Sequence, residues 1–275
     1  MKAFLLPLLL TIFCCTCVRA QKAFPKPVND IVPERTSLQR PALTKPPLRE
    51  ADLLWQKRVW RVIDVNEKIN HSFSNPERPF ISILLEAAEK EEIQLYSTLD
   101  DKFSMPLTED QRLSIVGGMD TIEVIDIDGD FGTNYEIVPR VFNPATVSRY
   151  RVQEVWYIDK NSSRMQVRIL GIAPIVDEVD EMGNFLFEEP LFWVYYPAAR
   201  NMLARERAWV SDNETAASSW EDVFEMRYFD SFVTKEGNVY DRRIKDYVAD
   251  RRSQLIEGKR AERERLAKES DLWSY

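Results

Sequence analysis

The chain has 275 residues, with 37 Lys and Arg against 45 Asp and Glu, three cysteines and a single histidine. A formal net charge of −8 argues against nucleic acid as the partner, because nucleic-acid binding relies on a basic surface. The single histidine, His71, excludes a multi-histidine zinc site, and any Ser-His-Asp triad would have to use it.

Residues 1–20 have the pattern of a secretory signal peptide. Lys2 supplies the positive start, an apolar run extends from Ala3 to Phe13, and a small residue precedes the expected cleavage site before Gln21. The apolar run is too short for a membrane-spanning helix, which needs about 20 residues. An exported chain without a later long apolar run is expected in an extracytoplasmic space, most simply a bacterial periplasm.

All three cysteines lie at the end of this apolar run, which leaves a lipoprotein signal as the alternative. None of Cys14, Cys15 and Cys17 follows the small residue that lipoprotein processing requires, so ordinary cleavage before Gln21 is favoured. The processed chain would then hold no thiol for a disulfide, a nucleophile or a metal.

Residues 21–50 are predicted to form a proline-rich extended arm. They contain six prolines, and each proline fixes φ and removes a backbone donor. Two interpretations stay open. The arm is either a disordered linker or a segment that orders against a neighbouring subunit, at low entropic cost because the chain is already extended.

The stretch from Leu54 to Asn70 begins the globular domain, which is expected over residues 51–250. A short helix over 50–57 followed by a strand over 59–65 is predicted, although a continuous helix to Ile69 fits almost as well. Its mixture of large apolar and cationic side chains fits either a core strand or a docking surface. The candidate partner-interface residues are four from this stretch and one from the C-terminal tail: Trp55, Arg58, Trp60, Arg61 and Trp273.

The rest of the domain predicts an α+β fold with a mainly antiparallel central sheet flanked by helices. Helices are expected over 78–92 and 107–116, from Pro197 to Leu203, and after a capping box formed by Ser218 and Glu221. Strands are expected over 93–96, 121–127, 150–159, 191–196 and 229–235, and from Met165 to an irregular end near Gly171 and Pro174.

A last helix is expected from Asp241 to about Glu269. Its apolar stripe lies only in the first half, and beyond Ile256 it is almost wholly charged. We therefore expect the first half to pack and the second half to project into solvent or onto a partner. Residues 251–275 form this charged helix and a tail, which is either frayed or a docking peptide.

The strongest enzymatic alternative is a magnesium-dependent phosphatase using Asp126 and Asp128. A strand that ends in D-x-D-G resembles the nucleophile loop of haloacid-dehalogenase-type phosphatases. The other carboxylates of such a site are not in the required order, and a strand-end turn explains the same residues.

Two weaker candidates are an acidic loop and the lone histidine. The loop could bind calcium or be a solvated turn, and it contains Asp177, Glu178, Asp180 and Glu181. His71 could be a base or a pH switch, or simply structural. No glycine-rich phosphate loop or nucleophile elbow occurs in the sequence, so no cofactor is expected and a protein that binds proteins is favoured.

Four segments in this order together resemble the GldN/PorN family of gliding-motility proteins from the type IX secretion system of the Bacteroidota. They are LLWQKRVWRVIDVNEKIN, LDDKF, PLFWVYYPAARNMLA and SWEDVFEMRYFDSFVTKEGNVYDRRIKDY. The resemblance spans about residues 50–250.

The resemblance implies a periplasmic, non-enzymatic assembly subunit. Such a subunit forms a ring with copies of itself and an outer-membrane lipoprotein (GldK/PorK), and membrane association is through partners alone. It also meets the periplasmic shaft of an inner-membrane motor protein (GldM/PorM). The family has no catalytic residues to carry over.

Overall fold

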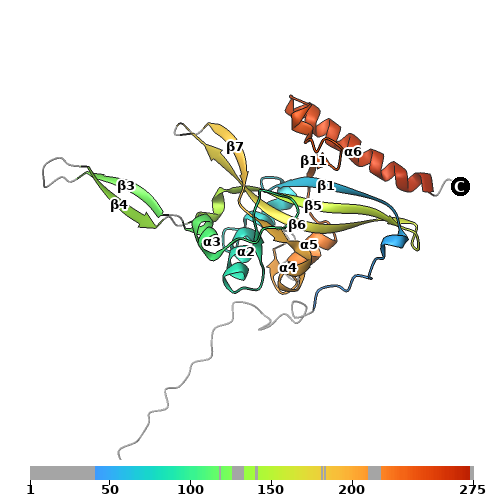
Figure 1. Cartoon of the computed structure of the whole chain (residues 1–275), viewed down its shortest axis with the longest axis horizontal. Helices are drawn as coiled ribbons and strands as arrows, with labels where there is room; N and C mark the ends of the chain where they lie inside the picture. Colours follow the sequence, from blue (N-terminus) through green and yellow to red (C-terminus); the bar gives the residue numbers. More distant parts are fainter. Residues whose placement is uncertain are drawn as a thin grey trace, which may run out of the picture. The chain divides into compact units, whose positions relative to one another are not determined.

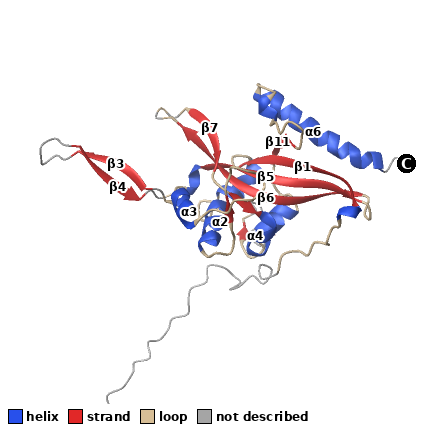
Figure 2. Cartoon of the chain, viewed as in Figure 1, coloured by secondary structure: helices blue, strands red, loops and turns tan. Residues whose placement is uncertain are grey.

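A computed structural model of the chain describes residues 41–117, 119–125, 133–139, 142–180, 182, 184–209 and 218–272. Its centre is a seven-stranded antiparallel sheet, with strands in the order β11-β1-β5-β6-β8-β2 and β7 paired with β6 (Figures 1 and 2). Helices accompany the sheet, which confirms the predicted α+β class. The expected signal peptide and residues 21–40 of the arm lie outside the described residues.

The sheet strands are β1 Leu53–Asp64, β2 Leu95–Tyr96, β5 Val147–Asp159, β6 Arg164–Val179, β7 Phe185–Pro190, β8 Trp193–Tyr195 and β11 Phe232–Glu236. Two further pairs are β3 Met119–Ile125 with β4 Thr133–Pro139, and β9 Arg207–Ala208 with β10 Ser218–Ser219. The helices are α2 Phe80–Glu89, α3 Glu109–Val116, α4 Tyr196–Leu203, α5 Trp220–Glu225 and α6 Arg251–Leu272. Short 3-10 turns cover Glu50–Asp52, Lys68–Ser74, Pro144–Thr146 and Ile244–Asp246.

The long antiparallel strands β1, β5 and β6 form the middle of the sheet. β1 already begins at Leu53, so the predicted helix over 50–57 is wrong except for the turn at Glu50–Asp52. Cross-strand pairing with β5 along almost the whole of β1 outweighs the weak helical pattern.

The predicted irregular strand end near Gly171 and Pro174 is a bulge within a strand that continues to Val179. Gln153 pairs with Gly171 and Glu154 pairs with Ile169, so the register shifts by one residue there. Glycine is needed at this position, because an added Cβ would lie 2.5 Å from the Phe103 ring.

The main core contains the buried faces of α2, α4 and α5 and of the sheet. Phe80 of α2 and Trp220 of α5 stack with ring centroids 4.3 Å apart, and Phe73 packs beside both. The amphipathic helix over 78–92 and the buried stripe of the helix at Trp220 are confirmed. The predicted capping box is wrong by one residue, since Ser219 is the cap and Asp222 completes the box.

The long C-terminal helix is confirmed as α6, which lies alongside β11 (Figure 1). It begins at Arg251 rather than Asp241. The expected division into a packed first half and a projecting second half is wrong, because Arg265 is only 2% exposed and Glu269 accepts a hydrogen bond from the Met165 N–H. Beyond Ile256 the helix packs through Gly258 and charged side chains. A search of the sequence for an apolar stripe does not detect such a contact.

The contact between α6 and β11 predicts that Gly258→Ala destabilises the protein. An added Cβ would lie 2.7 Å from the Val233 carbonyl oxygen, so the helix must shift, at a cost of about 1–3 kcal/mol of unfolding free energy. In a helix free of the sheet, the same change would stabilise by up to about 1 kcal/mol. Thermal unfolding gives the sign of the change in stability, and a raised Tm would show that α6 is not docked on β11.

Gly237→Ala is the matched control. Its added Cβ would meet its nearest neighbour, the Arg58 carbonyl oxygen, at 3.6 Å, an ordinary contact. We expect its Tm to match that of the unchanged protein.

Candidate partner-binding surfaces

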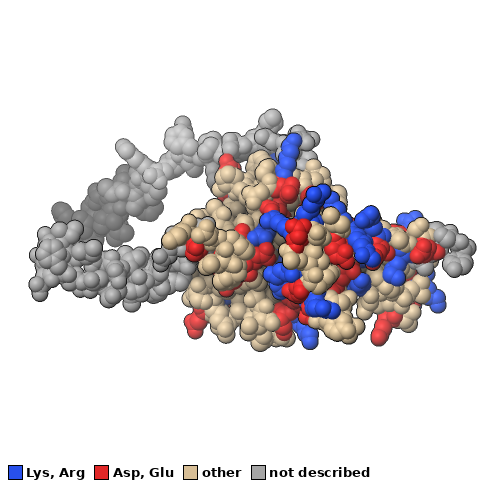
Figure 3. All heavy atoms as spheres, turned by 90° about the horizontal axis from the view of Figure 1, so that it is seen from above, with Lys and Arg blue, Asp and Glu red and all other residues tan. Residues whose placement is uncertain are grey.

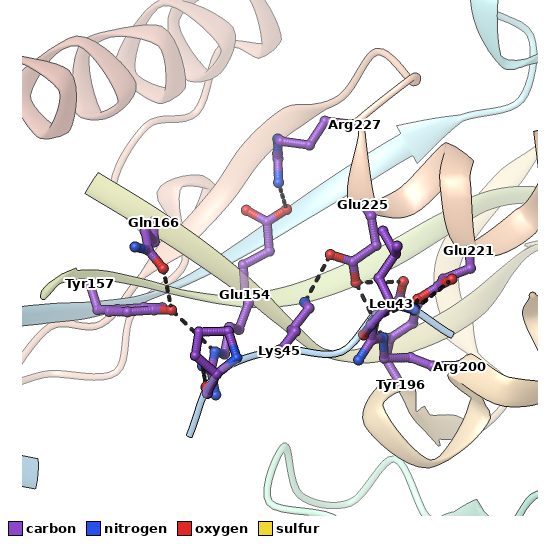
Figure 4. A network of polar contacts seen from close by, with 12 residues as sticks. Leu43, Lys45, Glu154, Tyr157, Gln166, Tyr196, Arg200, Glu221, Glu225 and Arg227 are labelled. Atoms are coloured by element: carbon purple, nitrogen blue, oxygen red, sulfur yellow. Dashed lines mark hydrogen bonds and ion pairs between the residues drawn. The ribbon is translucent and has the colours of Figure 1, made fainter. Parts of the chain in front are cut away.

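The described part of the proline-rich arm, residues 41–49, lies against α4 and α5 (Figure 4). The Leu43 N–H donates to Glu221 Oε1 at 3.0 Å, and Arg200 Nη2 donates to the Leu43 carbonyl oxygen at 2.5 Å. Both backbone polar groups of one arm residue are therefore held by a pair of side chains from the domain. We call Arg200 and Glu221 the arm clamp.

The arm clamp is itself held rigidly by burial and charge. Glu221 is fully buried, and its Oε1 accepts from Arg200 Nη2 at 2.6 Å. Next to it, Glu225 accepts from the Tyr196 hydroxyl at 3.0 Å and pairs with Lys45 of the arm at 2.9 Å. Burial, followed by the charge of Glu225, raises the pKa of Tyr196, so its hydroxyl stays protonated and remains a donor.

A second contact holds the arm three residues later. Arg168 Nη2 donates to the Pro46 carbonyl oxygen at 2.7 Å, and its Nε donates to the Tyr157 hydroxyl at 3.2 Å. Residues 41–49 thus order on their own domain. Neither the linker interpretation nor the neighbouring-subunit interpretation anticipated this contact.

The candidate interface residues lie in different environments. Trp60 and Arg61 are both only 5% exposed, Trp55 is half-buried and Arg58 is exposed. Trp273 lies outside the described residues. Contact of these residues with a partner stays a prediction, but the fold itself already uses most of those that the structure describes.

Arg61 connects β1 to α6. Its Nη1 and Nη2 both donate to Glu262 Oε1 at 3.0 Å, and its Nε donates to Ser231 Oγ at 3.0 Å. One buried guanidinium therefore joins the middle of the sheet to the C-terminal helix and to the segment before β11.

A second group of charges holds the last turns of α6. Arg265 pairs with Glu236 of β11, and its guanidinium lies 5.2 Å from the centre of the Trp156 ring. Lys268 lies 5.7 Å from the centre of the Trp55 ring. The half-buried Trp55 thus faces a cation of its own chain, as expected for a cation–π contact.

The enzymatic and metal-binding alternatives gain no support from the described residues. Asp126, Asp128 and Glu181 lie outside them. Asp177 is paired with Arg149, and Asp180 accepts hydrogen bonds from Asn184 in the turn. Within the described ranges there is no group of three His, Cys, Asp or Glu that could hold a metal ion.

The same residues also contain no helix that is long and apolar enough to cross a membrane. His71 is an exposed residue of the 3-10 turn Lys68–Ser74.

The described residues form an α+β domain whose buried polar groups hold the proline-rich arm and α6 in place. The model of one protein family, described as gliding motility associated protein GldN, matches residues 48–274. The chain therefore belongs to the GldN family and is a component of the gliding-motility machinery. The match extends beyond residues 50–250 and includes α6. No curated protein matches the chain.

The contacts of Arg61 predict that Arg61→Met destabilises the domain. The change removes a buried guanidinium with a carboxylate and a hydroxyl partner, which costs about 1–3 kcal/mol. We expect a lower Tm together with faster hydrogen exchange in α6. As the candidate interface residue proposed from the sequence, Arg61 would instead affect assembly when replaced and leave the domain folded.

Arg58→Met is the control for this test, because Arg58 is an exposed cation on the same strand. If both variants unfold at the same temperature as the unchanged protein, Arg61 does not hold α6 and its partner role regains support.

The arm clamp predicts that Glu221→Gln loosens residues 41–49. The amide keeps the shape but removes the charge from two hydrogen bonds, with an expected loss of about 1–3 kcal/mol. Hydrogen exchange at Leu43 should become faster, and limited proteolysis should cut the arm sooner. Glu67→Gln, at an exposed position, should change neither measurement. Unchanged protection of Leu43 in Glu221→Gln would show that the clamp does not hold the arm.

Proposed function

We propose that the protein is a non-enzymatic periplasmic scaffold subunit of the type IX secretion and gliding-motility machinery. It forms a ring with copies of itself and with a GldK/PorK-like outer-membrane lipoprotein, and it contacts the periplasmic shaft of a GldM/PorM-like motor protein. The observation that carries the proposal is the family match over residues 48–274, which spans nearly all of the described domain.

The way in which the two chain ends dock supports a ring. The arm is held through its backbone by the arm clamp, and α6 is held largely by ion pairs. Neither contact needs a large apolar surface, so each docking site could accept the same segment from a neighbouring copy. A ring requires two different surfaces for each contact between neighbours, and the arm with its clamp is such a pair.

The periplasmic location rests on the pattern of residues 1–20, and attachment to the outer membrane would come from the lipoprotein partner. In this arrangement residues 41–49 exchange the arm clamp of their own domain for that of a neighbouring subunit. The charged outer face of α6 is available to the motor shaft.

Co-expression tests the proposal. Expressed alone, the processed chain is expected to be unstable or aggregated, because a ring subunit without neighbours leaves its interfaces exposed. With the lipoprotein partner it should be soluble and should co-purify with it. A stable monomer that fails to bind the lipoprotein in a pull-down would refute the ring.

Crosslinking with mass spectrometry on the intact complex gives the matching structural readout. We expect links from residues 21–50 and 257–275 to other chains.

A further inference from the structure

A cavity of about 510 Å³ lies between the sheet and the segment that leads into α6. Strands β1, β5, β6, β7 and β11 contribute to its wall, together with η5, the 3-10 turn Ile244–Asp246, and the start of α6. It is independent of the arm clamp, because neither Arg200 nor Glu221 lines it. Figure 3 looks onto the side that carries β7 and α6 in Figure 1, where basic and acidic side chains alternate with uncharged surface.

Arg151 is the unusual residue of this wall. It is only 7% exposed, yet its guanidinium forms no hydrogen bond and no ion pair with any described residue. Burial, followed by the charge of Arg243, lowers its pKa, while the carboxylates of Asp101 and Glu188 act in the opposite direction from beyond ion-pair distance. The guanidinium stays charged. A buried, unpaired charge is costly and is rarely kept without a partner.

The neighbouring position on β1 also carries an unused donor. By register Val62 lies opposite Arg151, and Trp60 is the next residue on the same face. The Trp60 indole Nε1 is buried without an acceptor among the described residues. Its ring carries the Lys235 ammonium at 4.3 Å from the ring centre.

The charges around the cavity are unbalanced. Arg149 pairs with two carboxylates, Asp177 and Glu188, and Lys235 pairs with Asp241 and lies near Asp101. Four other lining cations have no ion-pair partner among the described residues: Arg151, Arg243, Lys245 and Arg251. The remaining wall is partly apolar, with Val62, Phe232 and Leu255.

We propose that this cavity binds a segment of another polypeptide through one Asp or Glu side chain at Arg151 and an adjacent apolar side chain against Val62 and Leu255. A carboxylate matches the planar donor fork of a guanidinium. It also fits better than a phosphate, because Asp64 and Asp101 lie in the same wall and would repel a second negative charge. The volume suits a few side chains rather than a whole folded element.

The occupant is a polypeptide because the chain is a component of a protein machinery. The inference goes beyond the proposed function, since it requires neither a ring nor a particular partner. Its failure would leave ring assembly untouched, and a monomeric protein could still show this binding.

Peptide selection tests the proposal. A random heptapeptide library displayed on phage is selected against the full processed chain, stabilised by its co-expressed partner if needed, and against Arg151→Met. We expect peptides with Asp or Glu beside an apolar residue to be enriched on the unchanged protein alone. The best peptide, resynthesised, should bind about tenfold or more weakly to Arg151→Met than to the unchanged protein. The same loss is expected on the unchanged protein when the Asp or Glu of the peptide is replaced by Asn or Gln.

Two controls separate binding from folding. Arg151→Met should keep or raise the Tm, because it removes an unpaired buried charge, whereas a structural arginine would lower it. Arg263→Met changes an exposed cation outside the cavity and should bind the peptide normally.

Three results would overturn the proposal. The first is selection of the same peptides on both proteins, and the second is equal affinity for the acid and amide peptides. The third is displacement of the peptide by excess inorganic phosphate, which would assign the cavity to a different anion.

Discussion

The pairing of β1 with β5 determines where Arg61 and Arg151 lie. Val62 is opposite Arg151 and Arg61 is opposite Val152, and successive side chains of a strand point to opposite faces. Arg61 therefore reaches α6, while Val62 and Arg151 line the cavity. A slip of one residue would exchange the two faces, and with them the anchor of α6 and the unpaired guanidinium. The dense aromatic core around Phe80 and Trp220 opposes such a slip, because it would expose Ile63 and Tyr150.

Elements with strong apolar periodicity could be predicted from the sequence. The helix containing Phe80 and the strands before and after residues 160–163 were expected, although the second of these strands, β6, continues to Val179, beyond its expected end. Weak or mixed patterns were misleading where distant residues decide the structure. The start of β1 has helical periodicity, but the pairing of eleven of its residues with β5 prevails there. Likewise Gly171 suggested an end, whereas the strand continues through a bulge there, next to the Phe103 ring.

The candidate surfaces were less predictable than the fold for a physical reason. Arg61 next to Trp60 resembles an exposed docking pair, and its partner Glu262 lies 201 residues later in the chain. A local pattern cannot reveal that contact. The arm clamp was missed for the same reason, since Arg200 and Glu221 are ordinary helix residues until the arm is placed beside them. One feature of the sequence points to the cavity, namely an arginine at an inward-facing position of a central strand. It can be interpreted only once the strand pairing is known.

The arm clamp recognises the backbone N–H and C=O of one residue and not its side chain. Arg200 and Glu221 contact only the carbonyl oxygen and the N–H of Leu43, groups that every residue except proline carries in full. The residue at position 43 can therefore change in evolution while the clamp is kept, provided that it is not proline, whereas the pair between Lys45 and Glu225 does depend on a side chain. Recognition through the backbone fixes where a non-proline residue must lie in the arm, and it leaves the side chain at that position free to change.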